Sequence, residues 1–176
     1  MMSFNAVICG GTYNPVHEGH LWVVQKLLDE IHEIENGLIV IATTFHNPWK
    51  GDVQPADFEL RLQMWEALLQ DSGLPSSRFP KNGHIYISDF RYVYAADFIK
   101  WWRTNYSGSQ TWVTSTDSAG LEKNWKDWSE LEVSMKVLPM HKDVHSTAIR
   151  KGSHPPAPAI RRIISQNRLY PNSQWE

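Results

Sequence analysis

The sequence GGTYNPVHEGH, residues 10–20, directly follows the short apolar run of residues 6–9 and is the most informative part of this chain. After a strand, the pair Gly10 and Gly11 allows the backbone to turn sharply and to come close to a ligand. Over residues 21–31, apolar residues then recur at spacings of three and four, which predicts a helix. Because the start of a helix exposes N–H groups and carries positive potential, we expect a phosphate to bind at this turn.

Strand-length apolar runs and helical patterns alternate along the rest of the chain. The runs are rich in Val and Ile and comprise residues 38–42, 85–87, 111–114 and 133–138. The periodic segments comprise residues 58–69, with start signals at Pro55 and Asp57, 95–103 and 159–166. Strand alternating with helix predicts an α/β fold, a doubly wound parallel sheet of about five strands with helices on both faces. We expect residues 1–176 to form one domain, because no part of the chain is long enough to bury a core of its own.

The composition of the 176 residues is that of a globular protein, with 41% hydrophobic and 20% charged residues and a net charge of -2. The single cysteine, Cys9, excludes an internal disulfide and favours a reducing compartment, so we expect a cytoplasmic protein. No apolar run approaches the roughly 20 residues that cross a bilayer, and the N-terminus lacks the basic start of a signal peptide. We therefore expect no membrane partner.

Charge is distributed unevenly along the chain. Residues 1–88 carry 5 Lys and Arg against 10 Asp and Glu, whereas residues 89–176 carry 12 against 9. The basic excess of the second half is too mild for a protein that coats nucleic acid, so we expect no nucleic-acid partner. It suits a small anionic ligand that the C-terminal half helps to hold.

Two histidines, His17 and His20, lie three residues apart at the start of the first predicted helix, so they can face the same way. Imidazoles beside a phosphate site are hydrogen-bond donors to its charged oxygens. There are two alternative interpretations. In one, the histidines are ordinary polar residues at a helix start, and in the other they are zinc ligands. The zinc site lacks further ligands, because Cys9 is the only cysteine and the spacing is not that of H-E-x-x-H.

A second phosphate-binding pattern, HSTAIRKG, occupies residues 145–152 near the other end of the chain. Ser146 and Thr147 can cap a short helix, and Arg150 then follows one turn later. Hydroxyls, helix N–H groups and a guanidinium together make a clamp for phosphate oxygens. Taken alone, the same string also fits an ordinary capped surface helix.

The two motifs resemble the GGTFDPIHxGHL and SSTxIR signatures of the nucleotidylyltransferase superfamily, whose members have a Rossmann-like fold and transfer a nucleotidyl group from a nucleoside triphosphate. This sequence departs from the signatures at Asn14, where the family more often has Asp, and at His145, which replaces the first Ser. The resemblance implies catalytic roles for His17, His20 and Arg150. It also implies ATP contacts from residues of both motifs: Gly10, Gly11, Thr12, Tyr13, His17, His20, Ser146, Thr147 and Arg150.

The middle of the chain is similar to one branch of that superfamily, the nicotinate or nicotinamide mononucleotide adenylyltransferases. The stretch that carries this similarity is DSAGLEKNWKDWSEL, residues 117–131. The resemblance implies that Asp117 contacts the ribose side of ATP and that Trp125 packs on the pyridine ring, for which a flat indole is a good platform. Trp128 is expected in the core, and Ser115 stands where the family has Gly two residues before the Asp.

Three further stretches agree with the resemblance to different degrees. In HNPWK, residues 46–50, the resemblance implies that Lys50 meets the phosphate of the mononucleotide, although a solvated loop lysine looks the same in sequence. Arg61, in register with an R-x-x-M helix of the family, is a candidate for a structural role. Tyr92 matches a segment that lines the pyridine pocket and is a candidate for binding the mononucleotide, but apolar residues replace its polar neighbours.

The nine tryptophans are a feature of this chain for which core packing is the simplest explanation. Only Trp125 has a predicted ligand, and Trp175 is expected to be a loose end. The tryptophans expected in the core comprise Trp22, Trp65, Trp112, Trp128 and at least one of the adjacent Trp101 and Trp102.

The resemblance implies a reaction in which ATP and a pyridine mononucleotide give pyrophosphate and a dinucleotide, either NAD or its deamido form. Mg²⁺ is expected as the cofactor, held mainly by the ATP phosphates and with no direct ligand from the protein. The alternatives are an adenylyltransferase for another acceptor such as phosphopantetheine, a cytidylyltransferase, and a catalytically weak nucleotide sensor. The sequence leaves open whether the substrate is the nicotinate or the nicotinamide mononucleotide, and whether the protein is a monomer or a homo-oligomer.

Overall fold

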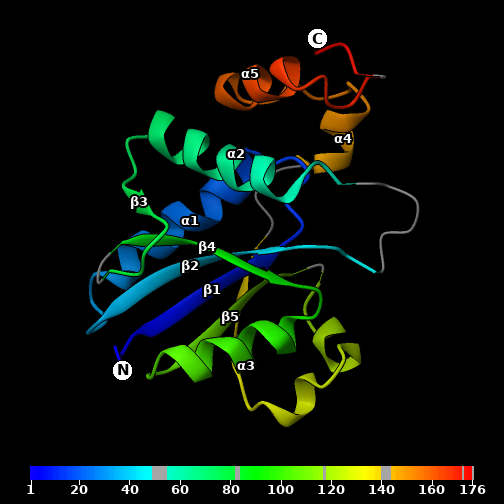
Figure 1. Cartoon of the computed structure of the whole chain (residues 1–176). Coiled ribbons are helices and arrows are strands. Elements are labelled where there is room, and N and C mark those ends of the chain that lie inside the picture. Colours follow the sequence, from blue (N-terminus) through cyan, green and yellow to red (C-terminus); the bar gives the residue numbers. More distant parts are fainter. Residues whose placement is uncertain (49–54, 82–83, 117, 140–143, 172, 176) are drawn as a thin grey trace.

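A six-stranded parallel sheet forms the centre of the molecule (Figure 1). The computed structural model describes residues 1–48, 55–81, 84–116, 118–139, 144–171 and 173–175. The strands are β1 (Asn5–Gly11), β2 (Gly37–Thr44), β3 (Ser76–Ser77), β4 (Ile85–Tyr92), β5 (Gln110–Ser115) and β6 (Ser134–Leu138). Their order is β3-β4-β2-β1-β5-β6, which confirms the doubly wound parallel sheet. The sequence missed only β3, because two residues are too few for a periodic pattern.

Burial on both faces explains why the central strands are continuous apolar runs. In β2, GLIVIATT, every residue except the last is buried. Side chains alternate between two cores, so that Ile39 and Ile41 enter one and Leu38 and Val40 enter the other. A strand with one face in water would instead show polar residues at every second position.

Helices cover both faces of the sheet (Figure 1). One side carries α1 (Glu18–Ile31), α2 (Phe58–Asp71), α4 (Ser146–Arg150) and α5 (Pro158–Gln166). The other side carries α3 (Ala95–Asn105) and the short 3-10 turns η1 (Leu121–Asn124) and η2 (Trp128–Glu130). The helices predicted from periodicity are therefore confirmed, with boundaries that differ by a few residues. Among the residues described, none of these helices has the length and apolarity that crossing a membrane requires.

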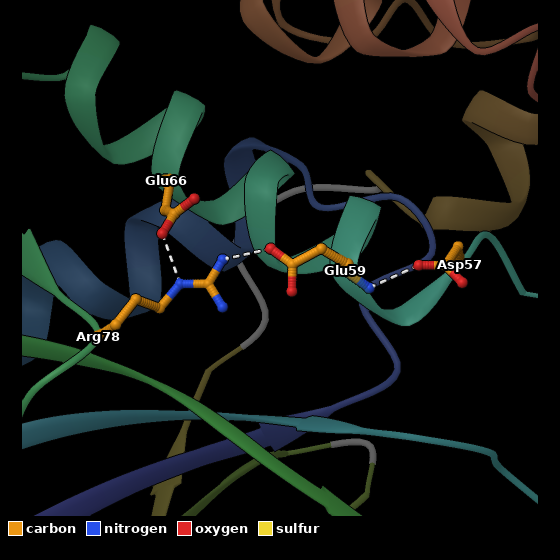
Figure 2. A network of polar contacts seen from close by, with 4 residues as sticks. All are labelled: Asp57, Glu59, Glu66 and Arg78. Atoms are coloured by element: carbon orange, nitrogen blue, oxygen red, sulfur yellow. Dashed lines mark hydrogen bonds and ion pairs between the residues drawn. The ribbon is translucent and has the colours of Figure 1, made fainter.

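The start of α2 lies where the sequence predicts it. Asp57 is the N-cap, and its carboxylate accepts a hydrogen bond of 2.9 Å from the backbone N–H of Glu59. Figure 2 shows that Arg78, just after β3, donates to Glu66 over 2.5 Å and to Glu59 over 3.0 Å. Both carboxylates are about half exposed, so these ion pairs add little stability. They nevertheless link β3 to the helix that carries Arg61.

Tryptophans occur in both cores, but Trp22 is only half-buried and belongs to neither, so its predicted core position is wrong. Trp65 packs in the core under α1 and α2, whereas Trp112 and Trp128 pack in the core on the α3 side, as expected. Trp175 contradicts the prediction of a loose end, because its side chain is only 8% exposed and its Nε1–H donates to the carbonyl oxygen of Ile149 over 2.9 Å. The C-terminal segment is therefore packed against α4.

The direction of strand addition reverses at β1. Strands β2 and β4 follow on one side of β1, and the chain then returns to place β5 on its other side. A reversal of this kind leaves a crevice at the carboxyl ends of the strands, which is where ligands bind in doubly wound sheets. The predicted phosphate-binding turn leaves β1 at this edge of the sheet.

Candidate active site

The glycine pair occupies the end of β1 rather than a turn. Gly10 and Gly11 pair with Ala42 and Thr43 of β2, so their predicted role as the turn is wrong. The turn follows at Tyr13, whose φ is 51°. Gly10 is required for a different reason, because a Cβ there would lie 2.0 Å from Cζ2 of the Trp112 indole.

Gly11 is constrained in the same way by the first motif itself. A Cβ at Gly11 would lie 2.9 Å from Cε1 of Tyr13, whose buried ring folds back over the strand. The same ring makes edge-to-face contacts with His20, at 4.8 Å between centroids, and with Trp65, at 4.9 Å. The absence of a side chain at Gly11 thus leaves room for the Tyr13 ring, which packs against His20 of the histidine pair.

The two histidines form a reciprocal cap at the start of α1. The Nδ1 atom of His17 accepts from the backbone N–H of Gly19, and Nδ1 of His20 accepts from the backbone N–H of His17, each over 3.2 Å. Their rings stack at 3.6 Å between centroids with an interplanar angle of 23°. A neutral imidazole that accepts at Nδ1 carries its proton on Nε2. The cap therefore makes both rings Nε2–H donors on one side of the helix start.

Burial keeps His17 neutral. Its side chain is 6% exposed, and the loss of water, followed by repulsion from His145 and His154, lowers its pKa from 6.5 to about 4. A neutral His17 can accept from the backbone and still donate through Nε2. The helix start adds positive potential from its backbone N–H groups, so the site attracts anions without a charged imidazole.

The second motif docks on the loop that leads to the histidines. The Ser146 hydroxyl donates to the carbonyl oxygen of Pro15 over 2.8 Å, and the Arg150 guanidinium donates to the carbonyl oxygen of Asn14. Arg150 also donates to the Thr147 hydroxyl over 3.0 Å. The structure thus brings together two motifs that lie about 130 residues apart, as the phosphate-clamp hypothesis requires.

The expected capping role of Ser146 and Thr147 is wrong. The N-cap of α4 is His145, which makes no side-chain cap, and both hydroxyl residues lie within the first turn of the helix. Their hydroxyls are used instead to contact Pro15 and Arg150. From sequence, a Ser-Thr pair that caps a short helix cannot be distinguished from one whose hydroxyls contact another segment, because both uses need the same residues.

A cleft opens between these two motifs and the loop after β2. Its lining comprises Thr12, Asn14, His46, Asn47, Pro55, Ser146 and Arg150. Within it, the Asn47 amide donates to the Thr12 hydroxyl over 3.2 Å. Hydroxyl, amide, imidazole and guanidinium groups therefore surround the cleft, and this donor set suits a ligand rich in anionic oxygens.

Arg61 donates hydrogen bonds to the loops that border this cleft. Its guanidinium is 1% exposed and donates to the carbonyl oxygens of Thr12, Thr44, Phe45 and Ala56, over 2.7 to 2.9 Å. These carbonyls belong to the loop after β1, to the end of β2 and the loop that follows it, and to the segment before α2. The structural role suggested by the sequence is therefore confirmed, and the four bonds show what it consists of.

Asn14 has a role that sequence reasoning missed. Its Oδ1 atom accepts from the backbone N–H of Ala56 over 3.0 Å and from the Tyr170 hydroxyl over 2.5 Å. The side chain is 5% exposed. No local pattern signals this contact, because Tyr170 follows Asn14 by 156 residues.

Trp125 lies in an aromatic cluster on the α3 side of the sheet. Its ring makes edge-to-face contacts with Trp128, at 5.1 Å, and with Trp112, at 5.9 Å. Trp128 is buried and serves the core, whereas Trp125 is only half-buried. Since Trp112 also covers Gly10, the cluster reaches the carboxyl end of β1, beside the phosphate motifs.

Tyr92 belongs to the core and not to a ligand pocket, which corrects its predicted position. The side chain is 3% exposed, its ring lies 5.1 Å from that of Phe98, and its hydroxyl donates to the carbonyl oxygen of Ala42 over 2.7 Å. Burial raises the pKa of this hydroxyl, so it remains a donor. The apolar residues that follow Tyr92 fit this burial.

Two predicted site residues, Lys50 and Asp117, lie outside the described residues. Within the described ranges, no three His, Cys, Asp or Glu side chains come close enough together to hold a metal ion. The residues that line the cleft include no Asp or Glu, and carboxylates are the protein ligands that Mg²⁺ usually uses.

This chain is similar in sequence and in fold to known proteins. A family model described as cytidylyltransferase-like matches residues 8–152. Proteins named as probable nicotinate-nucleotide adenylyltransferases from a Nitratiruptor species and from Neisseria meningitidis serogroup A are 24% and 29% identical. The alignments cover 90% and 92% of this chain, and 93% and 95% of those proteins.

The fold also matches a solved structure. Plasmodium falciparum nicotinic acid mononucleotide adenylyltransferase, complexed with NaAD, superimposes with a TM-score of 0.68. The match covers 97% of this chain and 98% of that one, at 15% sequence identity, so it speaks for the fold alone. The family model, in contrast, spans most of the chain and includes both phosphate motifs. This chain therefore belongs to the cytidylyltransferase-like family.

Proposed function

We propose that this protein is an adenylyltransferase that joins ATP to a pyridine mononucleotide and releases pyrophosphate. One observation carries the proposal. Two stacked imidazoles, His17 and His20, present Nε2–H donors at a helix start whose loop is hydrogen-bonded to Arg150. This arrangement suits a triphosphate whose α-phosphate reacts beside the histidines and whose β- and γ-phosphates leave as pyrophosphate beside Arg150. We also propose that the enzyme works in the cytoplasm.

The proposed reaction is an in-line displacement at the α-phosphorus of ATP. A phosphate oxygen of the mononucleotide forms the new bond to phosphorus, and the bond to the bridging oxygen of the β-phosphate breaks. The nucleophile is already an anion, so no general base is needed. Catalysis then rests on positioning and on stabilisation of the negative charge that develops at the α-phosphate and on the leaving group.

The residues divide this work by position. His17 and His20 donate to oxygens around the α-phosphate. Arg150, with the hydroxyl of Thr147, holds the β- and γ-phosphates and the departing pyrophosphate. The Ser146 hydroxyl donates its single proton to Pro15, so its part is to hold the loop after β1 against α4. The guanidinium has five N–H donors, so it can keep its bond to the loop while it binds phosphate oxygens.

Mg²⁺, when bound, neutralises charge on the triphosphate. Because the described lining of the cleft contains no carboxylate, we propose that phosphate oxygens and water supply most of the ligands of the ion. The chain's own part is to bind and orient the phosphates that carry it.

Trp125 is the proposed platform for the pyridine ring, with Lys50 at the phosphate of the mononucleotide and Asp117 at the adenosine. The half-buried Trp125 lies on the aromatic cluster that reaches the end of β1. Both sequence relatives described above are named for nicotinate-nucleotide, so we propose nicotinate mononucleotide as the substrate. Tyr92 has no part in this proposal because it is buried.

Pyrophosphate release tests the proposal directly. The purified protein is given ATP and Mg²⁺ with nicotinate mononucleotide, nicotinamide mononucleotide or phosphopantetheine, and CTP replaces ATP in a parallel series. We expect release with ATP and nicotinate mononucleotide. His20→Ala should lower kcat by about a hundredfold or more without unfolding the protein, because it removes one phosphate donor.

The other outcomes point elsewhere. Release only with phosphopantetheine, or only with CTP, would assign a different transferase. ATP binding without release from any acceptor would leave a nucleotide sensor.

A further inference from the structure

The C-terminal segment after α5, residues 167–171 and 173–175, returns to the phosphate-binding motifs. It is anchored on α4 and the loop that follows it. The Trp175 indole donates to the carbonyl oxygen of Ile149, and the Gln174 amide donates to the carbonyl oxygen of Gly152, each over 2.9 Å. This segment lies beyond residues 8–152, the part of the chain that the family model matches.

From this anchor, Tyr170 reaches the loop after β1. Its hydroxyl donates to Oδ1 of Asn14 over 2.5 Å. The backbone N–H of Ala56 also points at this atom over 3.0 Å, and since that N–H can only donate, the atom must be the amide oxygen. Burial raises the pKa of Tyr170, so its hydroxyl stays protonated and remains the donor.

The backbone of this segment is unusual. Both Arg168, with φ of 49°, and Tyr170, with φ of 57°, adopt the left-handed conformation that residues with a Cβ avoid. Such a conformation persists where surrounding contacts determine it, and here the packing of Trp175 and the bond to Asn14 do so.

The contacts of Asn14 connect this segment to the phosphate clamp. Its side chain is held by Tyr170 and Ala56, its carbonyl oxygen accepts from Arg150, and the carbonyl oxygen of the next residue, Pro15, accepts from the Ser146 hydroxyl. Asn14 also lines the cleft. One short stretch of backbone thus accepts hydrogen bonds from two residues of α4, Ser146 and Arg150.

We propose that Tyr170 is a positioning residue of the triphosphate site, and that it acts through Asn14. Fixing the Asn14 side chain orients the carbonyl oxygens of Asn14 and Pro15. The first holds Arg150 in place for the phosphates, and the second holds α4 through the Ser146 hydroxyl. The proposal deepens the proposed function and rests on it, because it assumes that the cleft binds a triphosphate.

A double-mutant cycle on ATP affinity tests the proposal. Isothermal titration calorimetry with ATP and Mg²⁺, without a mononucleotide, measures the Kd of the wild type, Tyr170→Phe, Asn14→Ala and the double variant. Tyr106→Phe, on the α3 side of the sheet, is the matched control. We expect Tyr170→Phe to weaken ATP binding about tenfold, the size of one buried hydrogen bond, and Tyr106→Phe to leave it unchanged.

The cycle then distinguishes positioning through Asn14 from general stability. If Tyr170 acts through Asn14, the double variant binds ATP no more weakly than Asn14→Ala alone. In turnover assays, Tyr170→Phe should raise the KM for ATP and leave the KM for nicotinate mononucleotide within twofold. Equal changes in both KM values, fully additive losses in Kd, or an unchanged Tyr170→Phe would each overturn the proposal.

Failure of the proposed function would look different. A wild type that binds ATP but releases no pyrophosphate with any acceptor would remove the transferase, while the cycle on Kd would still decide the role of Tyr170.

Discussion

The histidine pair shows how backbone contacts determine the chemistry of a side chain. N-cap positions usually carry Ser, Thr, Asp or Asn, whose oxygen accepts a backbone N–H. In this protein His17 does the same with Nδ1, and His20 completes the reciprocal cap. As a result, the ring protons of both imidazoles sit on Nε2. In the proposed function, capping and anion binding use opposite edges of the same imidazole.

This arrangement predicts a pH-dependent stability that belongs to His17. The pKa of His17 is about 4 in the folded protein against 6.5 normally, so between these values the unfolded chain binds more protons. The free energy of unfolding should therefore fall as the pH drops through this window, by at most about 3 kcal/mol from this residue. Urea unfolding at several pH values measures the loss.

His17→Asn is the matched variant, because its amide oxygen can cap the helix but does not titrate. We expect the stability of this variant to depend less on pH between 4 and 6.5 than that of the wild type. Parallel curves for the two proteins would show that His17 is not responsible.

At the scale of secondary structure, α2 is the element that organises the cleft. Its first turn is fixed by Asp57, and its second turn delivers Arg61 to four carbonyl oxygens in three different segments. All four acceptors are neutral, so the stability of this buried cation depends on the full set of hydrogen bonds. A guanidinium can make them because its donors diverge in one plane.

Arg61→Lys should therefore be strongly destabilising, although it keeps the charge. One ammonium group cannot reach all these carbonyls, so buried acceptors are left without donors. We expect the free energy of unfolding to fall by about 3 kcal/mol or more. Urea unfolding measures the change.

Arg91→Lys is the control for this change. Arg91 is exposed, and its guanidinium lies 5.3 Å from the ring of Phe45, so its loss should cost no more than about 1 kcal/mol. If the two substitutions cost the same, the network around Arg61 is not what stabilises the loops.

On the scale of the whole molecule, the proposed site combines contributions from both faces of the sheet. The phosphate motifs belong to the side of α1, α2 and α4, whereas the aromatic cluster of Trp125 belongs to the side of α3 (Figure 1). They meet at the carboxyl end of β1, where Trp112 covers Gly10. Damage to the ring platform should therefore affect one substrate and spare the other.

Trp125→Ala should raise the KM for nicotinate mononucleotide by about tenfold or more, because the pyridine ring of this substrate loses its stacking partner. The KM for ATP should change less than twofold. Steady-state kinetics with each substrate varied in turn measure the two values. Trp125→Phe, which keeps an aromatic ring, should recover part of the loss. An equal rise in both KM values would point to general destabilisation.

Features that depend on the spacing of residues close together in the chain could be predicted from the amino-acid sequence. The alternation of strands and helices, the starts of α1 and α2, and both phosphate motifs each depend on residues within one or two turns. The structural roles of Arg61 and Trp128 were also expected. The elements and the motifs depend on periodicity and on the chemistry of neighbouring residues, which a single chain displays directly, whereas the role of Arg61 was suggested by the resemblance to the family.

Features that join distant residues became visible only in the folded molecule. Gly10 is small because of Trp112, Tyr92 is buried against Ala42, and Tyr170 reaches Asn14 across 156 residues. Trp175, expected to be loose, is buried by packing against α4. The physical reason is common to all of them. Hydrogen bonding and burial depend on which side chains meet in space, and a contact between two segments far apart in the chain leaves no periodic pattern in the sequence of either segment.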